Sequence, residues 1–300
     1  MNLPDLIEQF HSEDKCRGYL EDLRWPEGVR CPRCNNASTS WIEKRKQHEC
    51  NECRYQFSVT AGTVFHDSHL PLWKWFLAIY LVGESKKGIS GKQLQRTLGV
   101  SYKTAWYMGH RIRSAMEDDS PVPLQGIVEV DETWIGGVHR KTTEDRSGRS
   151  KKKLVLGAIA RDGEVRLVMR SGGARETKAS YRKFVKDVVG DDAEYIFTDS
   201  DYSWGDMTDW NTKHRKVDHS TDEWVRGIVH TNTIESVWSL FKRSVVGTYH
   251  QLSAKHLPAY LDEMAFRFNN RHNAFLFRDT LLRMIEGETL PYAELIATEG

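Results

Sequence analysis

Two pairs of cysteines constrain the fold of this chain more than any other feature of its sequence. Cys31 is followed by Cys34 and Cys50 by Cys53, and residues 35–49 separate the two pairs. A spacing of two residues lets both thiolates of a pair turn onto one ion, and four thiolates complete a tetrahedral Zn²⁺ shell with no open position. The sequence therefore predicts a zinc ribbon with one structural zinc ion.

The residues around these pairs complete the prediction. Tyr55 and Phe57 follow the second pair and are expected to pack beneath the zinc knuckle, while His48 is the alternative ligand in place of one cysteine. Cys16 lies in an apolar helical pattern and is interpreted as a core residue. The N-terminus has no secretory signal, and the longest apolar stretch, residues 76–82, is too short to span a membrane. We expect a cytoplasmic protein, associated with the nucleoid when it is bound to DNA.

Residues 1–25 and 72–117 read as helical, the second block with turns at Gly83, Gly88 and Gly99. Within it, residues 90–106 have the pattern of two short helices joined by a tight turn. Gly99 can end the first helix, and Ser101 can cap the second. Residues 86–116 contain seven Lys or Arg and no Asp or Glu. This charge favours a DNA-binding helix-turn-helix over an ordinary helical hairpin, which is the alternative. The second helix would display polar residues to DNA: Tyr102, Lys103, Thr104, His110, Arg111 and Arg113.

A third module follows the linker at Pro121 and Pro123. Apolar runs predict strands over four segments: 126–131, 153–160, 164–169 and 194–198. Helices are expected over three others: 177–189, 231–246 and 257–273. Three strands, a helix, another strand and further helices indicate an α/β module, a mixed sheet with helices packed on it.

Acidic residues at strand ends of this module predict a metal site. Asp131 ends the first predicted strand, Asp199 follows the fourth, and side chains at the ends of neighbouring strands emerge at one edge of a sheet. Glu235 lies on the next helix, and Lys242 is two turns further along the same face. Such oxygens suit Mg²⁺, and paired ions about 3.5–4 Å apart clamp the attacking and leaving oxygens of a phosphodiester. Alternatively, the aspartates cap turns, and Glu235 and Lys242 form a solvated face.

The order of these motifs resembles the DDE transposases of bacterial insertion sequences, in the zinc-ribbon group related to Merlin elements. Five segments carry the resemblance: Val130–Gly137, Thr198–Ser200, His230–Arg243, Gly247–His250 and Phe266–Arg271. It implies an RNase H-like core with a five-stranded mixed sheet and flanking helices. In that core Asp131 would be shared by two Mg²⁺ (or Mn²⁺) ions, Asp199 and Glu235 would each hold one, and Lys242 would contact DNA. Asn232, one turn before Glu235, is the other candidate for the third acid's place.

The resemblance also implies partners and domains. Double-stranded DNA is expected as both terminal inverted repeats and target, with a homodimer or larger assembly holding two ends. The basic loop 138–153 would follow phosphates. The predicted DNA contacts are therefore Lys103, Thr104, Arg111 and Arg113 of the second helix of the helix-turn-helix, and Arg149 and Lys151 of this loop. A nuclease or resolvase on the same core, and a non-catalytic DNA-binding regulator, are the alternatives. The predicted domains are 1–60 (N-terminal helix and zinc ribbon), 61–120 (helix-turn-helix), 121–285 (catalytic) and 286–300 (tail).

Overall fold

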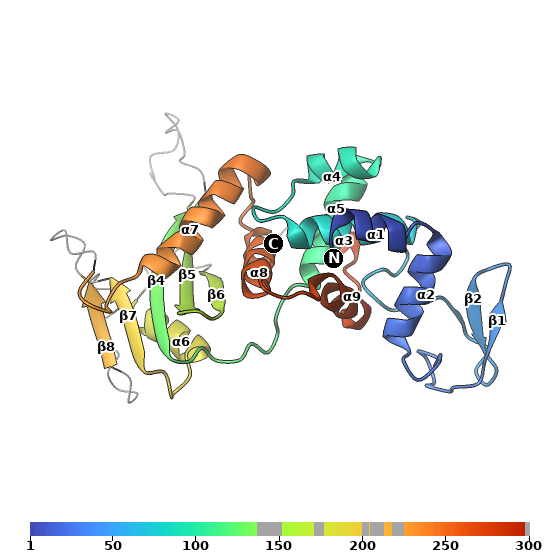
Figure 1. The fold of residues 1–300 in the computed structure, drawn as a ribbon, viewed down its shortest axis with the longest axis horizontal. Coiled ribbons are helices and arrows are strands. Elements are labelled where there is room, and N and C mark those ends of the chain that lie inside the picture. Colours follow the sequence, from blue (N-terminus) through green and yellow to red (C-terminus); the bar gives the residue numbers. More distant parts are fainter. Residues whose placement is uncertain (137–151, 171–176, 200–203, 205–212, 218–224, 298–300) are drawn as a thin grey trace. The chain divides into compact units, whose positions relative to one another are not determined.

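The computed structural model describes residues 1–136, 152–170, 177–199, 204, 213–217 and 225–297. The chain divides into two compact units, one formed by Met1–Glu117 with His272–Gly300 and the other by Asp118–Arg271 (Figure 1). Across the described ranges, no helix combines the length and apolar character that crossing a membrane requires.

The second unit is built on a five-stranded mixed sheet, with the strand order β6-β5-β4-β7-β8. The first three strands along the chain are antiparallel neighbours, whereas β7 runs parallel to β4 and β8 parallel to β7. This order and these directions are those of an RNase H-like core, so the predicted fold class is confirmed. The strands are β4 (Ile127–Ile135), β5 (Lys153–Ala160), β6 (Val165–Arg170), β7 (Tyr195–Asp199) and β8 (Lys213–Val217).

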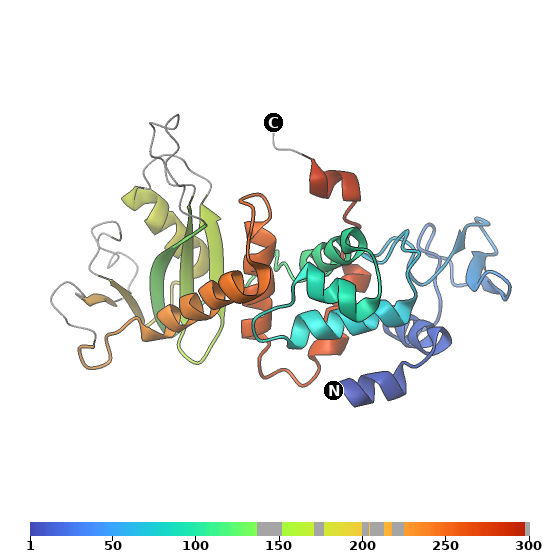
Figure 2. The ribbon, with the colours of Figure 1, turned by 90° about the horizontal axis from the view of Figure 1, so that it is seen from above.

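Helices cover both faces of this sheet. Figures 1 and 2 show α6 (Lys178–Val188) on one side and α7 (Asn232–Ser244) on the other. In strand β5, which lies between β6 and β4, Leu154 and Leu156 pack with the α6 core, while Val155 packs with α7 and α8 (Leu257–Asn269). Burial on both faces explains why β5 reads as a continuous apolar run. A π-helical turn, η4 (Val245–Tyr249), continues α7.

The first unit combines a small three-stranded antiparallel sheet with a helical bundle. Phe10 and Phe76 meet edge to face with ring centroids 4.8 Å apart, and Phe277 joins them from the C-terminal part of the chain. Its elements are α1 (Leu3–Gln9), α2 (Glu13–Arg24), β1 (Thr39–Ile42), β2 (Gln47–Cys50), β3 (Gln56–Phe57), α3 (Leu72–Glu84), α4 (Gly91–Leu98), α5 (Tyr102–Ser114), α9 (Leu276–Glu286) and α10 (Tyr292–Ile296).

Three details differ from the sequence prediction. Gly83 does not form a turn; it is buried inside α3, where Leu276 of α9 lies 3.7 Å from the position of a Cβ. Strand β8 was not predicted from its residues. Residues 272–285 group with the first unit rather than with the sheet module, because α9 buries Phe277, Leu281 and Met284 in the bundle.

Candidate active site

Two aspartates occupy matching positions on the parallel strands β4 and β7. Glu129 pairs with Phe197 in the register of these strands, and Asp131 and Asp199 each lie two residues further along. Because side chains alternate along a strand, both aspartates face the same side of the sheet as Glu129. Asp199 is the last residue of β7, but Asp131 lies in the middle of β4, which continues to Ile135. The prediction that Asp131 ends its strand is therefore wrong, since antiparallel pairing with β5 extends β4 further.

Glu235 reaches the same side of the sheet from the first turn of α7. An open pocket of about 440 Å³ is lined by Asp131, Glu235 and Lys242, together with Ser239. Thr231, which precedes the helix, donates a hydrogen bond from Oγ1 to Glu235 Oε1 over 3.0 Å. Among the described residues, neither Asn232 nor Asp199 lines this pocket, so Glu235 is the candidate that the pocket brings together with Asp131.

The charges around Asp131 act on its protonation. Burial is the main cause that raises the pKa of Asp131, to about 6, and the carboxylates of Glu235 and Asp199 raise it further. Hydrogen bonds from the backbone of Glu132 and the indole of Trp238 act in the opposite direction. Like charges that disfavour each other's ionised form are favourable ligands for a cation, because a bound divalent ion neutralises the repulsion.

Trp238 of α7 makes a hydrogen bond to Asp131 on the face of the sheet that α7 covers. Its indole Nε1 donates to Asp131 Oδ2 over 2.9 Å. The indole lies on β5 at Gly157, the direct cross-strand partner of Asp131. A Cβ at Gly157 would come within 2.5 Å of the Trp238 ring, so the missing side chain makes room for the contact.

Asp131, Asp199 and Glu235 do not form a close group of ligand atoms like that of the ribbon cysteines. Within the described part of the chain, the four ribbon cysteines are the only group of three or more His, Cys, Asp and Glu whose ligand atoms all lie within 4.8 Å of one another. A single ion would need the three carboxylates equally close.

The zinc ribbon has a preformed ligand set. The sulfur atoms pair at 3.6 Å (Cys31 with Cys53) and 3.5 Å (Cys34 with Cys50), as expected for thiolates around one tetrahedral ion. Phe57 packs in a cluster with two of these cysteines, and Tyr55 lies against it, as predicted. The alternative ligand, His48, instead lies 3.3 Å from Glu21 Oε1. Cys16 is fully buried, in agreement with its interpretation as a core residue.

Gly99 and Ser101 have the predicted roles at the turn of the helix-turn-helix. Gly99 has a φ of 61°, and the hydroxyl of Ser101 accepts the N–H of Thr104 at the start of α5. Lys103 is exposed, and Thr104 is partly exposed beside the cap.

The predicted display of basic residues further along α5 is wrong. His110, Arg111 and Arg113 are each at most 3 % exposed. Arg111 donates from Nη2 to His66 O over 2.7 Å and lies against the ring of Trp75, so its charge is used inside the unit. Arg149 and Lys151 lie outside the described residues.

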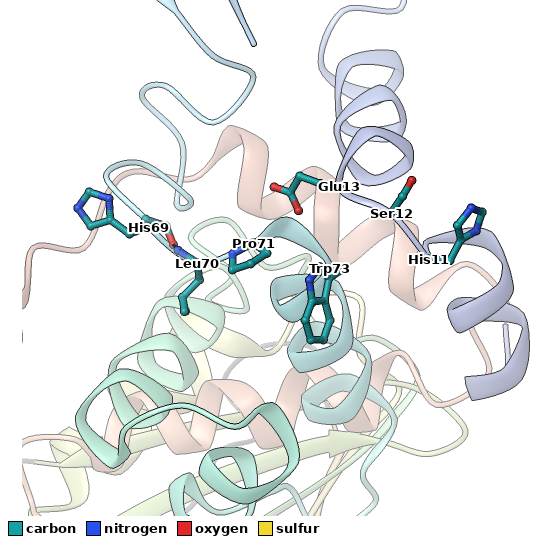
Figure 3. Close-up of a pocket in the computed structure, with 8 residues that line it drawn as sticks. His11, Ser12, Glu13, His69, Leu70, Pro71 and Trp73 are labelled. Atoms are coloured by element: carbon teal, nitrogen blue, oxygen red, sulfur yellow. Dashed lines mark hydrogen bonds between the residues drawn. The ribbon is translucent and has the colours of Figure 1, made fainter. Parts of the chain in front are cut away.

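A larger cavity, of about 630 Å³, lies in the first unit (Figure 3). Its lining includes His11, His69 and Trp73, with Glu13 between the segments that carry them. Both carboxylate oxygens of Glu13 accept the N–H of Leu72, at 3.0 and 2.8 Å, and so cap α3. Its acid therefore has a structural partner, and the pocket beside Asp131 remains the better candidate.

Sequence reasoning missed three residues around the acids: Glu129, Gly157 and the polar role of Trp238. A glutamate two residues before Asp131, in an otherwise apolar strand, is a signal that was present in the sequence. The partners of these residues come from distant segments, so no local spacing identifies them.

A zinc ribbon and helix-turn-helix preceding an RNase H-like core with paired strand aspartates is the architecture of a DDE transposase. The family profiles agree: residues 123–269 match the ISXO2-like transposase domain, and residues 11–56 match the transposase zinc-ribbon domain. The chain belongs to this ISXO2-like family of insertion-sequence transposases.

Similar proteins are found among known sequences and among solved structures. A protein described as uncharacterized, in transposable element ISH50 of Halobacterium salinarum, is 29% identical over 276 residues, which cover 87% of this chain and 92% of that protein. Among solved structures, the Mos1 strand transfer complex has 14% identity and a TM-score of 0.31, over 70% of this chain and 75% of that one. A pre-cleavage Mos1 transpososome has 13% identity and a TM-score of 0.31, over 72% and 79%.

Proposed function

We propose that this protein binds the terminal inverted repeats of its insertion sequence, hydrolyses a phosphodiester at each end and joins the freed 3′-hydroxyl to target DNA. The observation that carries the proposal is the shared pocket of Asp131, Glu235 and Lys242, in which burial, and to a smaller extent the neighbouring carboxylates, raise the pKa of Asp131 to about 6. A set of acids that repel one another around an open pocket, with an ammonium beside it, suits divalent ions and a phosphate.

Asp131, Asp199 and Glu235 would hold two Mg²⁺ or Mn²⁺ ions, with Asp131 shared. When bound, such ions supply Lewis acidity toward the scissile phosphate and neutralise charge in the transition state. The residues of the chain orient the reactants: Trp238 fixes the direction of the Asp131 carboxylate, and Lys242 binds a phosphate on the same pocket wall.

DNA recognition would lie in the first unit. Lys103 and Thr104 stand at the start of α5, where a recognition helix meets base edges. Lys103, Thr104 and the zinc ribbon would contact the inverted repeats, whereas the arginines later in α5 are buried. Two element ends must be cut in one event, so a homodimer or larger assembly on DNA follows from this function.

The test is a strand-transfer assay with pre-cut element ends, labelled at the 5′ end of the strand that carries the free 3′-hydroxyl, in Mg²⁺ or Mn²⁺. We expect joined products that are lost in Glu235→Gln and retained in the neighbouring Asn232→Ala. Cutting of uncut ends without any joining would instead identify a nuclease or resolvase. Specific end binding with neither reaction would identify a non-catalytic regulator.

A further inference from the structure

Glu129 is a fully buried carboxylate on the same side of β4 as Asp131. Burying an unpaired carboxylate costs several kcal/mol, so its partners indicate why it is there. Those partners belong to α7, to the turn that follows β5 and to the segment before α7, where His230 Nδ1 lies 3.2 Å from Glu129 Oε1. The helix α7 begins without a side-chain cap of its own.

The carboxylate of Glu129 provides that cap from the sheet. Its Oε2 accepts the backbone N–H of Thr233 at 2.8 Å and of Ile234 at 3.1 Å. Its Oε1 accepts the hydroxyl of Thr233 at 2.9 Å. The N–H groups of Thr233 and Ile234 belong to the first turn of the helix, where N–H groups have no acceptor within the helix itself and the positive end of the helix dipole favours a negative charge.

Arg161 completes the cluster. Its Nε donates to Glu129 Oε1 over 2.7 Å, and its Nη2 donates to His230 O over 3.2 Å. The guanidinium thus balances the charge of the buried Glu129 carboxylate. It also links the segment before α7, through His230, to that carboxylate. It lies over the ring of Phe197 on β7, so three strands and the helix start meet at Glu129.

Hydrogen bonds attach α7 to β4 at two places. Glu129 accepts the backbone N–H groups of Thr233 and Ile234, and Asp131 accepts the indole N–H of Trp238 one turn later. Glu235 lies between these two attachments. Its distance from Asp131 is therefore set by both attachments.

We propose that Glu129 is a positioning residue for the catalytic acids, which clamps the first turn of α7 to β4 and so fixes Glu235 relative to Asp131 for divalent-ion binding. This inference rests on the proposed function. Residues that orient metal ligands without contacting the ion typically change metal affinity by about 10–100-fold when they are replaced.

The experiment uses the full chain with Glu129→Gln, which keeps the side-chain shape but places an amide N–H₂ against the N–H donors. Hydrogen exchange over residues 231–238 and Mn²⁺ binding, titrated by electron paramagnetic resonance, are measured together. Glu13→Gln is the matched control, because Glu13 caps α3 in the other unit in the same way. Glu263→Gln controls for loss of a buried acid that pairs with Arg267.

In Glu129→Gln we expect exchange over residues 231–238 to quicken and Mn²⁺ affinity to fall by about tenfold or more. Neither control should change these two readings. If Glu129→Gln does not fold, Thr233→Val removes one donor to the carboxylate and should weaken Mn²⁺ binding by a smaller factor.

Unchanged exchange in a folded Glu129→Gln chain would overturn the clamp. Faster exchange with unchanged Mn²⁺ affinity would overturn the positioning role. If the parent and Asp131→Asn bind Mn²⁺ equally, the proposed function fails instead, and the exchange measurement still decides whether Glu129 holds the helix.

Discussion

Trp238 and Asp131 are joined by a 2.9 Å hydrogen bond from the indole Nε1 to Oδ2, which links α7 to the middle of β4. The bond passes over Gly157, the cross-strand partner of Asp131. One turn of α7 separates Trp238 from Glu235, so the residue that orients the Asp131 carboxylate lies next to Glu235.

Replacing Trp238 by Phe keeps an aromatic ring but removes the donor. A hydrogen bond to a charged group contributes about 1.5–3 kcal/mol, so we expect end cleavage to slow by about tenfold or more. The indole N–H also lowers the pKa of Asp131, and its loss should move the acid limb of the pH–rate profile to higher pH. Trp73→Phe, in the other unit, is the control; an unshifted acid limb in Trp238→Phe would contradict the orienting role.

Gly157→Ala tests the space beneath the indole. The added Cβ would lie 2.5 Å from the Trp238 ring, and overpacking of this kind destabilises a core by about 1–3 kcal/mol. Gly18→Ala in α2 meets nothing within 4 Å and should be neutral or slightly stabilising. Chemical denaturation measures both. In Gly157→Ala combined with Trp238→Phe, the smaller ring should relieve the clash, and strictly additive losses would count against it.

The raised pKa of Asp131 makes both stability and ion binding depend on pH. Between the ordinary aspartate pKa of about 3.9 and the folded value of about 6, the folded chain binds more protons than the unfolded chain. The contribution of Asp131 to the free energy of unfolding is therefore largest below pH 4, and this stabilisation is lost as pH rises through 6. Affinity for Mn²⁺ should rise over the same interval, because the ion needs the ionised carboxylate.

Asp131→Asn isolates this contribution. Without added divalent ions, we expect the variant to match the parent near pH 4 and to be more stable by about 2 kcal/mol at pH 7.5, measured by urea unfolding. A stability difference that is the same at both pH values would show that the ionisation of Asp131 has no such cost.

The two basic residues Lys103 and Arg111 should behave differently, although both lie on α5. Lys103→Ala should weaken binding to element ends and lower the slope of log affinity against log salt by about 1, with little loss of stability. Arg111→Met should destabilise the first unit by about 2 kcal/mol, because the His66 carbonyl loses a charged donor. Fluorescence anisotropy and thermal unfolding separate the two effects; equal losses of DNA binding in two folded variants would contradict the assignment.

Much of the fold could be predicted from local patterns. Strand β5 has the predicted bounds, since a run buried on both faces is apolar throughout. The turn between α4 and α5 follows from Gly99 and Ser101, whose conformations are local properties. Strand β8 was missed because it is an edge strand of sequence Lys-His-Arg-Lys-Val, with no apolar alternation to identify it.

The site could be predicted only in part, because its contacts are non-local. The acids were chosen from their residue type and their place near strands. The burial of Arg111 depends on His66 and Trp75, and the pairing of Glu129 with Arg161 depends on how β4 and β5 register. No spacing within one segment carries that information.

The central claim is that Asp131 works with bound divalent ions on DNA. It is tested most directly by measuring Mg²⁺- or Mn²⁺-dependent cleavage of element-end DNA by the parent and by Asp131→Asn, with zinc content and folding matched. The account predicts cleavage by the parent only when divalent ions are added, and a loss of at least about a thousandfold in the variant, as expected when a shared metal ligand is removed. Undiminished cleavage by a folded Asp131→Asn chain would contradict it.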